Sequence, residues 1–187
     1  MAFLINLEVG GRPALVVGGG AIAGRKIAAL LEAGAVVTVV APALADTVTA
    51  LERTGRIRVV RRAFEAGDTR GAFLVVSATD DDEVNRRVAE DARASGALVN
   101  VVDRPDLCTY TVPAVVRRGH LTIGVATDGR CPSVARILRE RLEGQFGPEY
   151  GEVVERLGDV RARLIAARVA VDAAARSATA ISADQAT

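Results

Sequence analysis

Three glycines form the clearest chemical motif in this sequence. Gly18-Gly19-Gly20 follows a short apolar run, precedes residues with helical spacing, and together with Ala23 fits the pattern G-x-G-x-x-G/A. In that pattern the first glycine permits a tight turn, and the second lets a pyrophosphate approach the backbone at the positive end of a helix. A plain glycine turn is the alternative. The preceding strand and the following helix favour a dinucleotide-binding loop.

A second candidate is Asp103, which directly follows the apolar run 97–102. An aspartate before Arg-Pro is commonly a turn residue. Ligands of doubly wound sheets, however, bind outside the carboxyl ends of the strands, where the glycine loop, Thr79 and Asp103 are all expected. His120 is the only histidine and Lys26 the only lysine, so acid–base chemistry falls mainly to carboxylates, tyrosines or a thiol. We therefore expect Asp103 to be the catalytic acid–base residue.

Two further stretches limit what the site can bind. The acidic run 79–83 is better explained as a helix start than as a metal site, with Thr79 or Asp80 as the cap and the acids offsetting the helix dipole. No metal ligands are predicted. Residues 40–43, at the end of the second strand, include no Asp, Glu or Arg to bind an adenosine ribose or its 2′-phosphate. The residues alone therefore leave NAD and NADP open.

The elements that must position these residues alternate along the first hundred residues. Apolar runs typical of strands occur at 14–17, 36–40, 57–60, 73–77 and 97–102, and helical spacing occurs at 21–33, 43–53 and 80–94. Strands that are apolar on both faces and alternate with helices indicate a parallel sheet covered on both sides. The predicted fold class is α/β, with a Rossmann-like doubly wound parallel sheet.

The pattern changes beyond Asp103. Two strands are predicted at 108–116 and 120–126, then a helix at 132–146 and a long helical stretch after Pro148. The stretch carries apolar residues on one face, and its end is expected to fray after about Arg176. These features predict a small α+β dimerisation segment, C-terminal helices and a homodimer. The predicted domains are a dinucleotide-binding domain at 1–112, a dimerisation segment at 113–147 and a C-terminal helical segment at 148–187.

Composition excludes several classes of protein. Half of the 187 residues are hydrophobic and a quarter are charged, which is typical of a globular chain. A net charge of +1 and 3% aromatic residues argue against nucleic-acid binding. No signal peptide and no membrane-spanning stretch are recognisable, and Cys108 and Cys131 are not a disulfide framework. We expect a cytoplasmic protein that does not bind membranes.

Three segments together closely resemble the precorrin-2 dehydrogenase module of siroheme synthases. They are ALVVGGGAIAGRKIAALLEAGAVVTVVAP, FLVVSATDDDEVNRRVAEDARASGALVNVVDRPDLCTYTVPAVV and TDGRCPSVARILRERLE. The resemblance covers roughly residues 3–150. It implies NAD-dependent oxidation of the tetrapyrrole precorrin-2 to sirohydrochlorin, a step towards siroheme. In some members of this family the same site also inserts ferrous iron.

The resemblance also implies roles for particular residues. The family's catalytic aspartate lies in an N-V-V-D segment, which matches residues 100–103. The glycine loop, the fourth strand's end and the family's NAD contacts together predict these cofactor-binding residues: Gly18, Gly20, Ala21, Ile22, Pro42, Ala43 and Thr79. Substrate contacts are expected from Asn100, Thr127 and Arg130. The family usually has serine in place of Thr127, and serine or threonine in place of Cys131.

Two other functions are alternatives to the dehydrogenase. A non-catalytic module that senses NAD would need the glycine loop but not Asp103. A generic short-chain dehydrogenase is disfavoured because Tyr-x-x-x-Lys is absent: Ala114 and Val154 follow Tyr110 and Tyr150 at that spacing.

Overall fold

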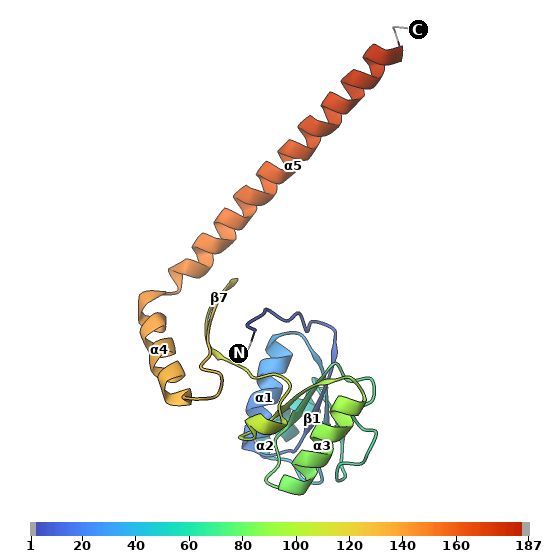
Figure 1. The fold of residues 1–187 in the computed structure, drawn as a ribbon, viewed down its shortest axis with the longest axis vertical. Coiled ribbons are helices and arrows are strands. Elements are labelled where there is room, and N and C mark those ends of the chain that lie inside the picture. Colours follow the sequence, from blue (N-terminus) through green and yellow to red (C-terminus); the bar gives the residue numbers. More distant parts are fainter. Residues whose placement is uncertain (1–2, 185–187) are drawn as a thin grey trace. The chain divides into compact units, whose positions relative to one another are not determined.

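The computed structural model describes residues 3–184, with side chains described as far as Val169. The chain divides into two compact units, Met1–Val112 and Pro113–Thr187 (Figure 1). None of the described helices is both long enough and apolar enough to cross a membrane.

The first unit is built on a five-stranded parallel sheet. Its strands are β1 (Pro13–Val17), β2 (Val36–Val40), β3 (Arg58–Val60), β4 (Leu74–Ser77) and β5 (Leu98–Val101). Their order is β3-β2-β1-β4-β5, and every neighbouring pair is parallel. The chain proceeds from β1 outward to one edge and then returns to build the other half. This reversal places a crevice at the carboxyl ends of β1 and β4.

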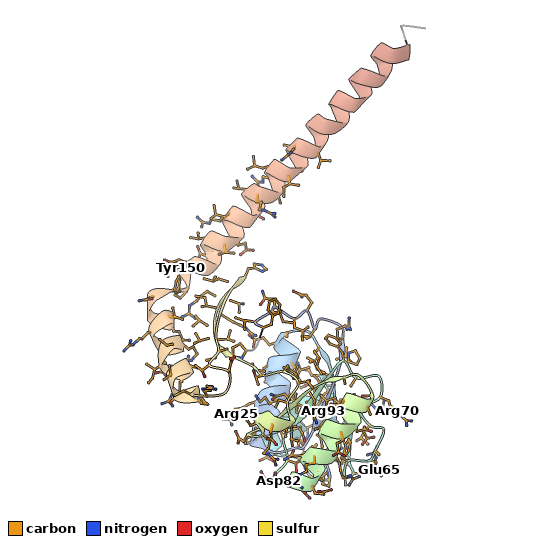
Figure 2. All side chains as sticks on the ribbon, in the orientation of Figure 1. Arg25, Glu65, Arg70, Asp82, Arg93 and Tyr150 are labelled. Carbon is orange, nitrogen blue, oxygen red and sulfur yellow. The ribbon has the colours of Figure 1, made fainter. Side chains whose placement is uncertain are left out.

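Helices cover both faces of this sheet. On one face, α1 (Ala21–Glu32) and α2 (Asp46–Arg53) bury Ile27 and Val48 against the strands. On the other face, α3 (Asp82–Ala94) buries Val88 among strand residues that include Val75 and Val99. Figure 2 shows the side chains packed between the sheet and its helices. The predicted fold class, an α/β doubly wound parallel sheet, is confirmed.

The second unit contains an antiparallel pair and two helices. Its elements are β6 (Ala114–Arg118), β7 (Leu121–Val125), α4 (Pro132–Gln145) and α5 (Glu149–Asp184). The Arg118 guanidinium donates hydrogen bonds to the carbonyls of Phe146 (2.8 Å) and Glu143 (3.1 Å), and so ties the last turn of α4 to β6. The helix α5 continues past Arg176, where fraying is predicted, to Asp184; residues 185–187 lie outside the described residues.

Several predicted element boundaries differ from the structure. The helix α2 begins at Asp46 rather than 43 because Ala45 is extended and its N–H donates to the Gly19 carbonyl (2.8 Å). The cap of α3 is Asp81, not Thr79 or Asp80: its carboxylate accepts from the N–H groups of Glu83 and Val84. The strand predicted from residue 108 begins at Ala114, because residues 108–110 bond to the open edge of β5.

Candidate functional site

The glycine loop joins β1 to α1 and contains two positions at which packing requires glycine. Gly18 has φ +113°, and a Cβ there would collide with the Ala78 carbonyl. A Cβ at Gly19 would collide with the Ala43 carbonyl. The loop is therefore held tightly between the segments that follow β4 and β2.

Gly20 differs from both of its neighbours. Its backbone is extended (φ −77°, ψ −176°), which any residue adopts, and a Cβ there would meet no atom within 4 Å. Neither backbone conformation nor protein packing therefore requires glycine at this position. Gly20 caps α1 without a side-chain hydrogen bond, and the first turn of α1 carries no acidic residue. This open, uncapped helix start fits the pyrophosphate of a dinucleotide.

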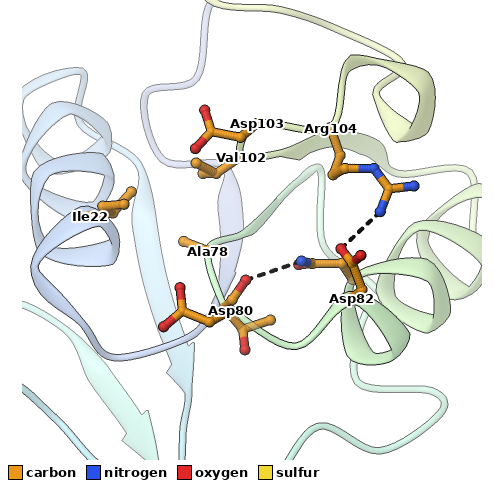
Figure 3. A pocket seen from close by; sticks show the side chains of 9 residues that line it. Ile22, Ala78, Asp80, Asp82, Val102, Asp103 and Arg104 are labelled. Carbon is orange, nitrogen blue, oxygen red and sulfur yellow. Dashed lines mark hydrogen bonds and ion pairs between the residues drawn. The ribbon is translucent and has the colours of Figure 1, made fainter.

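A pocket of about 210 Å³ lies at the carboxyl ends of the strands (Figure 3). Its walls come from α1, from the segments that follow β4 and β5, and from the start of α3. The lining residues are Ile22, Ala78, Thr79, Asp80, Asp82, Asn85, Val102, Asp103 and Arg104. Ile22 and Thr79 are two of the predicted cofactor residues. The topology thus brings them into one site with the predicted catalytic aspartate.

Asp103 is both a turn residue and a free carboxylate. It has φ +58°, a conformation that aspartate tolerates better than most residues, in a turn closed by the bond from the Arg104 N–H to the Val101 carbonyl (3.3 Å). The side chain is exposed and lines the pocket. Within the described part of the chain, its carboxylate has no hydrogen bond and no ion pair. Its oxygens are therefore available to a ligand.

Comparisons with known proteins agree with this geometry. A family model described as NAD(P)-binding matches residues 5–114. The chain is 47% identical over 149 residues to a siroheme synthase of Methylobacillus flagellatus and 42% identical over 160 residues to that of Methylococcus capsulatus. These alignments cover 80% and 86% of this chain but only 32% and 34% of the relatives. The chain thus spans about a third of the length of these relatives.

A solved structure is matched over most of its own length. The structure "SirC, precorrin-2 dehydrogenase" superimposes with a TM-score of 0.76 at 32% identity, over 86% of this chain and 79% of that chain. The chain belongs to the precorrin-2 dehydrogenase family. The resemblance read from the sequence is confirmed, and so is membership of an NAD(P)-binding family.

The remaining cofactor residues predicted for this family member surround the glycine loop. Ala21 and Ile22 are the first two residues of α1, and both are exposed. Pro42 and Ala43 follow β2 and are also exposed, beside Gly19. Their contact with NAD remains a prediction that the accessible positions support.

Arg104 joins two walls of the pocket through ion pairs. Its guanidinium bonds Asp82 at the start of α3 (2.8 Å) and forms a two-point pair with Asp106 (3.0 and 3.1 Å). The hydrogen bonds with Asp106 and then Asp82 raise the pKa of Arg104, and the Arg104 partner lowers the pKa of Asp106. Both sides of this guanidinium are thus engaged by protein carboxylates. Arg104 thereby links the turn after β5 to the start of α3.

Asn85 is a pocket residue that the sequence analysis did not single out. It is 4% exposed, accepts a hydrogen bond from the Ser77 hydroxyl (2.7 Å) and donates one to the Thr79 carbonyl (3.0 Å). These two bonds hold the segment between β4 and α3 in place. The available signal was its spacing: Asn85 lies three and four residues before Val88 and Ala89, on the buried face of α3.

Asn100, predicted to contact substrate, lies elsewhere. It is 8% exposed, does not line the pocket, and donates from its amide to the Tyr110 carbonyl (3.1 Å). This bond holds Asn100 at the edge of β5, and its contact with substrate remains a prediction. Burial also raises the pKa of Tyr110, so its phenol stays protonated at neutral pH.

Thr127 and Arg130 belong to the second unit, in the turn before α4. The Thr127 carbonyl accepts from the Arg130 N–H (2.9 Å), and its hydroxyl accepts from the Cys131 N–H (3.3 Å). Asp128 and Gly129 have φ values of +50° and +74°, which makes this turn tight. Substrate contacts from Thr127 and Arg130 remain predictions.

Proposed function

We propose that this protein catalyses NAD-dependent dehydrogenation of precorrin-2 to sirohydrochlorin in siroheme biosynthesis. The observation that carries the proposal is the unpaired Asp103 carboxylate, which shares a pocket with Ile22 and Thr79 beside the glycine loop. The family relationship indicates the substrate, and the NAD(P)-binding model indicates the cofactor.

Different residues of the chain would bind the cofactor, accept the proton and shape the pocket. The residues that would hold NAD are Gly18, Gly20, Ala21, Ile22, Pro42, Ala43 and Thr79. When bound, NAD supplies the hydride acceptor. Loss of a hydride leaves a proton for the oxidised macrocycle to release, and a carboxylate oxygen of Asp103 would accept it. Asn85 and Arg104 hold the walls of the pocket. They would thereby set the distance between Asp103 and the residues that hold NAD.

Anaerobic turnover of precorrin-2 tests the proposal directly. Purified protein with NAD is expected to produce the absorbance of sirohydrochlorin together with that of NADH. If the protein binds NAD but forms neither product, the dehydrogenase assignment fails. The NAD-sensing module would then be the better explanation.

Gly20→Val tests the cofactor site. The substitution leaves an allowed backbone and no clash within the protein, but it places a branched side chain where the pyrophosphate would approach. Overpacking of this kind costs about 1–3 kcal/mol, so the affinity for NAD should fall roughly 5- to 150-fold in a calorimetric titration. Thermal stability should stay close to that of the parent.

Gly18→Ala is the matched control. Its Cβ meets the Ala78 carbonyl at φ +113°, so this variant should lose stability because the fold itself requires glycine there. Unchanged NAD affinity in Gly20→Val would remove the cofactor assignment.

We also propose a homodimer that forms through the second unit. Val153, Leu157, Val160 and Leu164 recur at helical spacing on α5, and each is 48–66% exposed. A second copy of the chain would remove this apolar stripe from water. Light scattering should give twice the monomer mass, and a monomer at micromolar concentration would contradict the proposal.

Ferrous iron is proposed as a further substrate at the same site. Its insertion into sirohydrochlorin would reuse the Asp103 carboxylate, since residues 3–169, whose side chains are described, contain no group of three or more His, Cys, Asp or Glu side chains arranged to hold a metal. The test is formation of siroheme from sirohydrochlorin and Fe²⁺ without NAD. An unchanged sirohydrochlorin spectrum would limit the protein to dehydrogenation.

A further inference from the structure

The strand that leads to Asp103 lies at an edge of the sheet. One side of β5 pairs with β4, and residues 108–110 bond to the other side. The Thr109 N–H donates to the Val99 carbonyl (2.8 Å), and the Thr109 hydroxyl accepts from the Val99 N–H (2.8 Å). One step further along, the Val101 N–H donates to the Cys108 sulfur (3.2 Å). Two side chains thus replace the carbonyls that a sixth strand would supply.

The Cys108 sulfur also contacts both ends of the turn that contains Asp103. The thiol lies 3.3 Å from the Val101 carbonyl oxygen and 3.3 Å from the Arg104 carbonyl oxygen, and donates to either. The Val101 carbonyl also accepts the Arg104 N–H that closes the turn. One sulfur atom therefore bridges the residue where β5 ends and the residue immediately after Asp103.

The carboxylate itself has nothing comparable to orient it. Within the described residues, the Asp103 side chain has no hydrogen-bonding partner, and its backbone has φ +58°. The direction of the carboxylate consequently depends on how firmly the backbone of the turn is held. Bonds from Val102 to Ser77 and from Arg104 to Asp82 hold the two sides of the turn, and the Cys108 sulfur is the atom that contacts both Val101 and Arg104.

We propose that Cys108 is a positioning residue for the reaction: its thiol holds the turn that aims the Asp103 carboxylate into the pocket. This inference rests on the proposed function of Asp103. A misplacement of about 1 Å is sufficient to lower a rate by up to about 100-fold, so a device that fixes the turn has a direct effect on turnover.

Thr109 provides a matched control on the same edge. Both side chains accept one backbone N–H of β5, but Thr109 contacts Val99 and Cys108 contacts the turn. Thr109→Val removes the hydroxyl and keeps the branched shape, whereas Cys108→Ala removes the sulfur. A purely structural role for Cys108 predicts that both variants lose stability and keep their turnover.

Kinetics separate the two roles. We expect Cys108→Ala to lower kcat for precorrin-2 about 10- to 100-fold, while KM and the affinity for NAD stay within about twofold. Cys108→Ser retains a donor and an acceptor and should recover most of kcat. Thr109→Val should turn over within about twofold of the parent. If Cys108→Ala also turns over within twofold, or if Thr109→Val loses as much activity, the positioning role is overturned.

Hydrogen exchange provides a readout that needs no substrate. The Arg104 N–H closes the turn, so its exchange should accelerate in Cys108→Ala, recover in Cys108→Ser and remain unchanged in Thr109→Val. If the parent protein does not turn over precorrin-2, only the proposed function fails. Exchange of the Arg104 N–H still tests whether Cys108 holds the turn. Lower turnover in Cys108→Ala without faster exchange at Arg104 would overturn the inference. If Cys108→Ala does not fold, the comparison is made with Cys108→Ser. That variant must then exchange the Arg104 N–H at the parental rate and keep at least about half of the parental kcat.

Discussion

Two aspartates of the first unit, Asp91 and Asp103, show how differently one carboxylate can be used. The Asp91 carboxylate accepts from the N–H groups of Gly67 (2.9 and 3.0 Å) and Thr69 (3.3 Å), and from the Thr69 hydroxyl (2.7 Å). The Asp103 carboxylate accepts no hydrogen bond within the described residues. A carboxylate has a limited number of acceptor sites, so bonds within the fold leave fewer for a ligand.

The bonds made by Asp91 attach a long connection to α3. They join the segment between β3 and β4 to α3, and the fully buried Thr69 lies between Asp91 and the Ser95 hydroxyl (3.0 Å). Burial raises the pKa of Asp91, but the hydrogen bonds from Thr69 and Gly67 outweigh it and place the pKa below its ordinary value. Asp91 is thus a structural carboxylate, and Asp103 is the one left free for chemistry.

Asp103→Asn is expected to have the largest effect. Asparagine keeps the size of the side chain and tolerates positive φ, so the turn and the fold should survive. It cannot accept a proton at neutral pH, and loss of a general base lowers rates by about 10²–10⁴-fold. Anaerobic turnover of precorrin-2, with NAD affinity measured in parallel, tests this. Turnover within a few-fold of the parent would reduce Asp103 to a turn residue.

Asp91→Asn should give the opposite result. The amide group presents N–H to the N–H groups of Gly67 and Thr69, so hydrogen bonds are lost and donors are left facing each other. We expect the free energy of unfolding to fall by about 1–3 kcal/mol in urea titrations. Turnover per folded molecule should match that of the parent. A large loss of rate with unchanged stability would erase the distinction between the two aspartates.

A smaller effect on stability is expected when the pH is lowered. Because the pKa of Asp91 is lowered in the folded state, its ionised form contributes stability above its unfolded pKa of about 3.9, and that contribution is lost as the pH falls through the folded pKa. The difference in free energy of unfolding between the parent and Asp91→Asn should therefore be larger at neutral pH than at about pH 3. A difference that is constant between these two pH values would show that ionisation of Asp91 does not stabilise the fold.

Much of the fold was predictable because its signals are local. The buried strands read as continuous apolar runs, Gly18 directly follows β1, and Asp103 lies two residues after β5. One prediction failed where side chains bond to the backbone of another element. The strand predicted from residue 108 does not form there, because Cys108 and Thr109 are used by the edge of β5.

The sequence by itself determined the fold class, the family and the position of Asp103 at a strand end, because apolar period, glycine spacing and a family motif are all properties of neighbouring residues. Tertiary structure alone decided which polar groups are left without partners. Asp91 and Asp103 look alike in the sequence, yet one accepts bonds from residues 67 and 69 and the other faces a pocket. The physical reason is that a hydrogen bond depends on distance in space, which the chain's order does not specify.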